Sequence, residues 1–342
     1  MHNVKTLTTP VEYCLEVAQS HDGSLGYVDA MLKSLARRGI RLVKFQMHLP
    51  EYESTIDEPF RAELIGQDAS RYDYWKRTGF TFAQWKMIYQ WCVSLKIEFL
   101  CTPLSCEAVD ALLALGVDRF KIASGDATNW QLVDYIVSKG KPTIVSTGLS
   151  STGEIENLVK RFPTNFPLTL LYCVSKYPAS DEDIDLSSIT KLKSKYPNLK
   201  VGYSDHTGNP LIGIAAAHYG AEFIEQHVVF TKEQYGPDTS SSVDLHEAEL
   251  VQRYLDLMVK LNENSEIGLK KVNNSYEVTK SVFSRGLSLK NSLRKGELLL
   301  EENVIMKKPL GPLSWSERTL VVGKVASRDL DSGFHIEIKD FE

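Results

Sequence analysis

The clearest fold signal lies at residues 201–230, which read VGYSDHTGNPLIGIAAAHYGAEFIEQHVVF. Val201–Ser204 and Phe223–Val228 are short runs of strand length that are rich in apolar residues. Between them, Leu211–Tyr219 is predicted to be a helix that ends at Gly220, because glycine is favoured just after the last helical turn. A strand, a helix and a second strand in this order are typical of a parallel β/α unit.

The same alternation extends outward from this unit. The other predicted strands are Tyr13–Val17, Leu42–Gln46, Glu98–Cys101, Arg119–Ala123, Thr143–Ser146 and Leu168–Val174. The other predicted helices are one with Val28, Met31, Leu32 and Leu35 on one face, then Phe82–Leu95, Cys106–Leu115, Trp130–Lys139, Gly153–Phe162, Leu186–Tyr196 and Glu247–Asn264. Eight β/α units within 11–264 match the roughly 250 residues of a (β/α)8 TIM barrel, an α/β fold.

A doubly wound open sheet is the alternative architecture. It would normally carry a glycine-rich phosphate fingerprint after its first strand. That turn reads Gln19-Ser20-His21-Asp22-Gly23 here, which favours the barrel.

The character of the chain changes after the predicted barrel, residues 1–264. Residues 265–280 are polar and are expected to form a linker. Residues 281–342 are expected to form a small β-rich domain, with β pieces at Val282–Leu289, Leu298–Leu300, Thr319–Val325 and His335–Ile338.

Composition excludes several classes of protein. The 39 basic and 44 acidic residues give a net charge of −5 without a basic block, so neither nucleic acid nor an anionic membrane is an expected partner. No apolar run reaches the ~20 residues of a membrane span, and the N-terminus lacks an apolar signal segment. The five cysteines show no Cys-x-x-Cys spacing, so a reduced, cytoplasmic location is expected.

Polar side chains gather where the predicted strands end, which is where barrel enzymes carry their active sites. Two lysines and several hydroxyl groups are among them, and they predict a site for an anion, most simply a phosphate. For either lysine alone, a salt bridge to a neighbouring carboxylate is the alternative. The residues concerned are Lys44, Thr102, Lys121, Ser124 and Ser204.

Two histidines end adjacent predicted strands, His206 on the seventh and His227 on the eighth. Imidazoles from neighbouring strands can share one divalent ion and leave positions open for substrate. Local hydrogen bonding of each ring is the alternative. Four other histidines, His21, His48, His218 and His246, are expected in loops or at the surface, whereas Trp85 and Tyr89 are expected in the core.

Seven stretches resemble the sialic acid synthase family, which makes nonulosonic acids such as N-acetylneuraminate, legionaminate and pseudaminate. They are VKFQ (43–46), FLCTP (99–103), KIASG (121–125), STG (146–148), GYSDHT (202–207), IEQH (224–227) and GPD (236–238). LRKGELL (293–299) resembles the antifreeze-like (SAF) domain of that family. The resemblance covers nearly the whole chain.

The resemblance implies a condensation of phosphoenolpyruvate with an N-acylated hexosamine, in the biosynthesis of cell-surface polysaccharides. It assigns phosphoenolpyruvate binding to Lys44, Thr102, Lys121, Ser124, Ser175 and Ser204. It assigns the divalent metal, Mn²⁺ with Mg²⁺ or Co²⁺ as alternatives, to His206 and His227, beside Glu16 as an orienting residue. It assigns the sugar to Gln46, Tyr177, Glu225, Asp238 and Lys308. It also implies a domain-swapped homodimer, with the small domain of one chain over the barrel of its partner.

The chain departs from the family pattern at several positions. Lys308 stands where the family has an arginine that reaches the partner's sugar, and lysine cannot form the same planar fork. The first loop has Ser20 before His21 instead of asparagine, and Glu51–Lys76 differs from the neuraminate-making members. The identity of the sugar is therefore open.

Two other functions remain alternatives at this level. A Schiff-base aldolase acting on pyruvate and a sugar aldehyde would use Lys121 or Lys44 as its nucleophile. A sugar-binding protein without activity is the other, although the complete set of strand-end groups argues against it.

Overall fold

The computed structural model describes residues 10–61, 66–263 and 276–342. The chain divides into two units, Met1–Asn264 and Ser265–Glu342. Residues 265–275 of the predicted linker, 265–280, lie outside the described residues.

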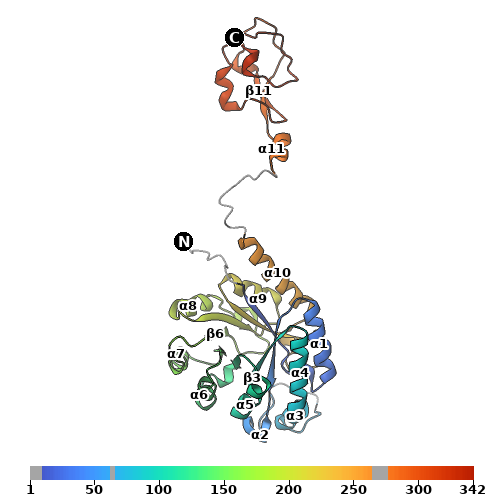
Figure 1. Ribbon diagram of the computed structural model, residues 1–342, viewed down its shortest axis with the longest axis vertical. Coiled ribbons are helices and arrows are strands. Elements are labelled where there is room, and N and C mark those ends of the chain that lie inside the picture. The colour runs from blue at the N-terminus through green and yellow to red at the C-terminus, as the bar shows by residue number, and fades with distance from the viewer. Residues whose placement is uncertain (1–9, 62–65, 264–275) are drawn as a thin grey trace. The chain divides into compact units, whose positions relative to one another are not determined.

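Eight parallel strands form the first unit (Figure 1). They are β1 (Glu12–Glu16), β2 (Leu42–Met47), β3 (Glu98–Pro103), β4 (Phe120–Ile122), β5 (Thr143–Ser146), β6 (Leu168–Cys173), β7 (Lys200–Asp205) and β8 (Phe223–Val228). Their hydrogen-bonded order is β3-β2-β1-β8-β7-β6-β5-β4, and the two ends of this path, β3 and β4, contact each other. The short β9 (Ser242–Val243) pairs with β8. The barrel prediction is confirmed, and the open sheet is excluded.

Helices surround the barrel on its outer side (Figure 1). They are α1 (Leu25–Arg37), α4 (Phe82–Ser94), α5 (Cys106–Leu115), α6 (Trp130–Ser138), α7 (Thr152–Arg161), α8 (Ser187–Lys195), α9 (Pro210–His218) and α10 (Leu245–Glu263). Val28, Met31, Leu32 and Leu35 are buried on α1, as their spacing predicts. Gly116 ends α5 with φ +91°, a conformation that glycine adopts without strain. None of the described helices is long and apolar enough to cross a bilayer.

The connection between β2 and α4 contains two helices that the sequence analysis did not predict, α2 (Pro50–Glu53) and α3 (Arg71–Thr78). Ser70 caps α3 by accepting a hydrogen bond from the Asp73 N–H. Only Tyr74, Trp75 and Thr78 of α3 are buried. The apolar face of this helix is therefore short, and the charged residues around it in the sequence make the helical pattern hard to recognise.

The second unit has less strand than predicted. It contains α11 (Glu277–Phe283) and an antiparallel pair, β10 (Gly286–Leu289) and β11 (Val304–Lys307). The prediction of strands at the other three β pieces is wrong. These segments contribute isolated bridges, such as the one from Leu298 to Val325. They also overlap short 3-10 helices, η8 (Trp315–Leu320) and η9 (Ile338–Asp340). Apolar side chains of these segments are nevertheless buried in a core of their own, which includes Leu287, Leu299, Val321 and Ile336.

Candidate active site

Two lysines from different strands meet on one carboxylate inside the barrel. Lys44 of β2 forms an ion pair with Glu16 of the adjacent β1, and its Nζ lies 3.5 Å from Oε1 of Glu225 on β8. Lys44 also donates a hydrogen bond of 3.3 Å to Thr102 Oγ1. Nζ of Lys121, from β4, lies 3.9 Å from the other carboxylate oxygen of Glu225. All five side chains are buried, so these charges act on one another with little screening.

Burial and pairing set the protonation of this cluster. Burial lowers the pKa of Lys121 to about 8, because desolvation disfavours its ammonium form. Burial raises the pKa of Glu225, but the charges of Lys121 and Lys44 outweigh it and hold that pKa below its ordinary value. Ser204 donates to Glu225 Oε1 at 3.3 Å, and Lys121 donates to Ser146 Oγ at 2.7 Å. The salt bridges that were the alternative for each lysine are therefore present, and both lysines share one carboxylate.

Ser124 and Ser175 both contact the thiol of Cys173. Their Oγ atoms lie 3.6 and 3.7 Å from its Sγ, and Ser124 Oγ also accepts a hydrogen bond of 3.1 Å from the Gly148 N–H. A Cβ on Gly148 would lie 2.4 Å from Ser175 Oγ, so a side chain here would displace that hydroxyl group. Sγ of Cys173 lies 3.7 Å from Nδ1 of His206, which joins the two hydroxyl groups to the histidine pair.

The structure places His206 and His227 side by side. Their ring centres are 5.3 Å apart, and both rings are buried. Nδ1 of His206 donates a hydrogen bond of 2.9 Å to the Val174 carbonyl, which fixes the orientation of this ring. Nδ1 of His227 has no partner among the described residues. Burial lowers the pKa of His227 to about 3, so this ring is neutral at pH 7.

These two imidazoles fit a divalent ion. His227 is a buried, neutral ring with an unpartnered nitrogen, which is the state in which histidine binds a metal, and the His206 ring lies beside it. No group of three or more histidine, cysteine, aspartate or glutamate ligands occurs within the described ranges. Asp205, close in sequence, instead accepts hydrogen bonds from Gln226 and Thr207. An ion held here would have these two histidines as its protein ligands, and its other positions would go to substrate or water.

A cavity of about 440 Å³ adjoins this cluster. Four residues that the resemblance assigns to the sugar or the metal line it: Gln46, Tyr177, His227 and Asp238. Lys44 and Glu225 lie two positions before Gln46 and His227 on the same strands, so their side chains point the same way, one layer deeper in the barrel. Of the residues that the resemblance assigns to the sugar, Gln46, Tyr177 and Asp238 therefore line the cavity, whereas Glu225 lies with Lys44 in the deeper layer.

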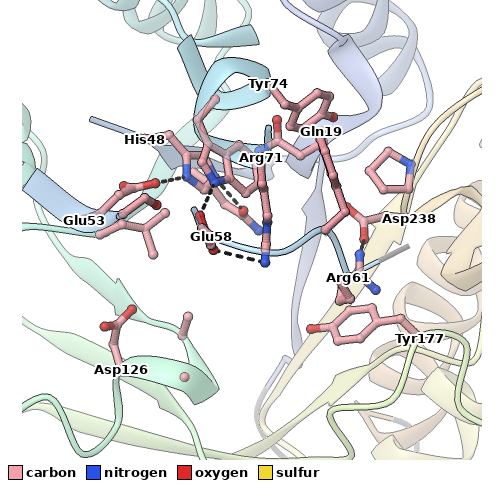
Figure 2. A pocket seen from close by; sticks show the side chains of 18 of the residues that line it. Gln19, His48, Glu53, Glu58, Arg61, Arg71, Tyr74, Asp126, Tyr177 and Asp238 are labelled. Carbon is pink, nitrogen blue, oxygen red and sulfur yellow. Dashed lines mark hydrogen bonds and ion pairs between the residues drawn. The ribbon is translucent and has the colours of Figure 1, made fainter. Parts of the chain in front are cut away.

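The connection between β2 and α4 builds much of the cavity wall, which the sequence did not predict (Figure 2). Wall residues from this segment include His48, Glu53, Ser54, Glu58, Phe60, Arg61, Arg71, Tyr74 and Trp75, and Asp126 lines the cavity from the end of β4. Glu58 holds this wall together: it pairs with Arg71 at 3.0 Å and accepts a hydrogen bond of 3.1 Å from Trp75 Nε1. In the sequence, Tyr74 and Trp75 are two adjacent aromatic residues among charged ones, and this pattern alone does not distinguish a cavity wall from a core position.

His48 lies in a loop, as expected, but at the cavity, whereas His21 is buried in a short 3-10 turn. His48 lines the cavity, stacked on Trp75 with ring centres 3.8 Å apart, and its Nδ1 lies 2.6 Å from Glu53 Oε1. His21 is buried against Phe80 at 4.7 Å. Both follow a barrel strand, and the packing of α3 and its flanks covers them. His218 and His246 are exposed, as expected.

Lys308 belongs to the second unit. Its Nζ lies 5.2 Å from the centre of the Phe283 ring of α11. This contact is within that unit.

Comparison with known proteins gives one consistent family. A family model described as the NeuB family matches residues 31–265. The chain is 29% identical to an N,N'-diacetyllegionaminic acid synthase of Campylobacter jejuni, over 92% of this chain and 95% of that protein. It is 26% identical to a pseudaminic acid synthase of Helicobacter pylori, over 97% and 98%.

A solved structure agrees. The chain superposes on an N-acetylneuraminic acid (sialic acid) synthetase of Leptospira borgpetersenii, in complex with citrate, with a TM-score of 0.67, 29% identity and coverage of 80% of this chain and 90% of that one. The family model spans more than half of the chain, and the similarity to the two synthases covers nearly all of it. The chain therefore belongs to the NeuB family of sialic, legionaminic and pseudaminic acid synthases.

Proposed function

We propose that this protein is a nonulosonic acid synthase that condenses phosphoenolpyruvate with an N-acylated hexosamine. The products are a nine-carbon 2-keto-3-deoxy sugar acid and phosphate. The observation that carries the proposal is the convergence of Lys44 and Lys121 on Glu225, one layer below a cavity that is lined by His227. The names of the relatives support the class of product.

The buried lysines are the proposed anion site. Phosphate and carboxylate groups need charge-assisted donors, and an ammonium group supplies them. Bound phosphoenolpyruvate would take over donors that Lys44 and Lys121 now direct at Glu16, Glu225 and Ser146. Thr102, Ser124, Ser175 and Ser204 would add hydroxyl donors from neighbouring strand ends.

The proposed reaction joins two carbon atoms. C3 of phosphoenolpyruvate attacks the aldehyde carbon of the open-chain sugar, the π electrons of the aldehyde move to its oxygen, and positive charge is left at C2. Water adds to C2, and the bond between C2 and the bridging oxygen breaks, so that oxygen leaves with the phosphate. One proton of the water goes to the former aldehyde oxygen and the other to the phosphate. His206 and His227 would hold a divalent ion, Mn²⁺ with Mg²⁺ or Co²⁺ as alternatives, and Lewis-acid polarisation of the aldehyde is the chemistry such an ion supplies when bound. Glu16, fixed by Lys44 and the Ala18 N–H at 2.7 Å, would orient the reacting groups.

The cavity above is the proposed sugar site. Gln46, Tyr177 and Asp238 present an amide, a phenol and a carboxylate to it, which suits a polyhydroxylated ligand. Glu225, which the resemblance also assigns to the sugar, lies in the deeper layer. We also propose that the protein forms a domain-swapped homodimer in which Lys308 of one chain serves the partner's cavity.

An isotope experiment tests this proposal. The enzyme is given phosphoenolpyruvate with ¹⁸O in the bridging position, Mn²⁺ and a panel of mannosamine, di-N-acetylated hexosamine and altrosamine derivatives. We expect sugar-dependent phosphate release with the label in phosphate. Label retained in the sugar acid, or no release with any sugar, would overturn the proposal.

A Schiff-base aldolase is the second candidate, favoured by one observation. Burial lowers the pKa of Lys121 to about 8, and a partly neutral lysine is the nucleophile that such an enzyme needs. Treatment with pyruvate and borohydride distinguishes the two. The aldolase predicts a stable adduct on Lys121 that is detectable by mass spectrometry, whereas the synthase forms no imine.

A further inference from the structure

We propose that Arg61 is a specificity-determining residue of the sugar cavity, where it donates hydrogen bonds to the neutral acyl carbonyl of the amino sugar. The inference rests on the proposed function, because it concerns the same cavity. It assigns a role to the connection between β2 and α4, which supplies Arg61.

Arg61 links two cavity residues that are far from it in sequence. Its Nη2 donates to Oδ1 of Asp238 at 2.5 Å, and its guanidinium lies 4.2 Å from the centre of the Tyr177 ring. Figure 2 shows the guanidinium between these two side chains. Asp238 holds the edge of the group and Tyr177 supports its face, so the guanidinium is oriented before any ligand arrives.

Most donors of this guanidinium remain free. A guanidinium carries five N–H donors. Among residues 10–61, 66–263 and 276–342, the structure gives Arg61 one hydrogen-bond acceptor, Asp238. The side chain is 36% exposed and lines the cavity, so the remaining donors are available to a ligand.

The charges around Arg61 favour a neutral ligand group. Four carboxylates line this cavity, Glu53, Glu58, Asp126 and Asp238, against the guanidinium groups of Arg61 and Arg71. Each arginine is already paired, with Asp238 at 2.5 Å and Glu58 at 3.0 Å. A phosphate here would face an excess of negative charge, whereas an amide carbonyl accepts hydrogen bonds without adding charge.

The deeper layer differs in its charge. There two lysines meet two carboxylates, Glu16 and Glu225, and the proposed divalent ion at His206 and His227 would add two positive charges. The site therefore has an anion-binding layer for phosphoenolpyruvate and an outer cavity for an uncharged acceptor. The acyl carbonyl is the acceptor's strongest neutral hydrogen-bond acceptor, and Arg61 is the wall residue with the most free donors.

The test compares R61M with R161M. Arg161 is a close match outside the barrel: it pairs with Asp134 at 2.6 Å, lies 4.3 Å from the Trp130 ring centre and is 34% exposed. Steady-state rates are measured with an N-acetylated hexosamine and with the parent hexose, which carries a hydroxyl group at the same carbon. We expect R61M to raise the KM for the N-acetylated sugar roughly tenfold or more, with the KM for phosphoenolpyruvate unchanged. The preference for the N-acetylated sugar over the parent hexose should fall by the same factor, and R161M should match the wild type.

Three results would overturn this role. R61M and R161M could change the KM for the N-acetylated sugar equally, or R61M could lower the activity with both sugars by the same factor. The third is a preference of the wild type for a phosphorylated acceptor sugar. Calorimetric binding of the N-acetylated sugar separates the two proposals. Binding that depends on Arg61 without phosphate release would contradict the proposed function alone. Phosphate release that is indifferent to Arg61 would contradict this inference alone.

Discussion

The rings of His206 and His227 lie with their centres 5.3 Å apart, at the ends of the adjacent strands β7 and β8. The first ring is fixed by the Val174 carbonyl, and the second keeps an unpartnered nitrogen in a buried position. An unpaired buried polar atom is costly. A divalent ion would satisfy it, so this pair is the place to test the proposed chemistry.

His206→Ala and His227→Ala should each lower phosphate release roughly a hundredfold or more, because the proposed ion supplies several kcal/mol of transition-state stabilisation. Each variant should also bind Mn²⁺ more weakly in a calorimetric titration, while circular dichroism shows the fold intact. His218→Ala is the matched control, since that ring is exposed and bonds only to Tyr254 among the described residues. Activity near the wild-type level in either variant, or full activity after chelation, would remove the metal from the proposal.

The barrel and the strand-end residues could be predicted because both depend on local pattern. Apolar strands and glycine-ended helices alternate along the chain, and parallel strands then bring their ends together. The wall of the cavity could not be predicted in this way. Its geometry depends on contacts between distant segments, such as the Arg61–Asp238 ion pair across 177 positions. In the second unit, single bridges replace strands, and isolated bridges leave no periodic pattern in the sequence.

Lys121 should make stability depend on pH in the alkaline range. Its pKa is about 8 in the folded protein, below its ordinary value near 10.5, so between these values the unfolded chain binds more protons and stability rises with pH. Over this window the free energy of unfolding of the wild type should rise relative to Lys121→Met by about 3 kcal/mol. Urea unfolding at several pH values measures it. A difference between wild type and Lys121→Met that falls with pH would contradict the assignment.

Gly148 should tolerate a side chain poorly, because a Cβ there would press on the side chains of Ser175 and Cys173 near the ends of β5 and β6. A Cβ there would lie 2.4 Å from Ser175 Oγ, 2.9 Å from Cys173 Sγ and 3.1 Å from the Cys173 carbonyl oxygen. Gly148→Ala should therefore lower the free energy of unfolding by about 1–3 kcal/mol and weaken phosphoenolpyruvate binding, since the Gly148 N–H positions Ser124. Urea unfolding and the KM for phosphoenolpyruvate measure the two effects.

Gly153→Ala is the control for this prediction. Gly153 lies in the first turn of α7 with open space around it, and alanine favours the helix by about 0.5–1 kcal/mol. This variant should be as stable as the wild type or slightly more so, with an unchanged KM. If Gly148→Ala behaved in the same way, the close approach of β5 and β6 would not limit the site, and the hydroxyl groups of Ser124 and Ser175 would have no fixed place in anion binding.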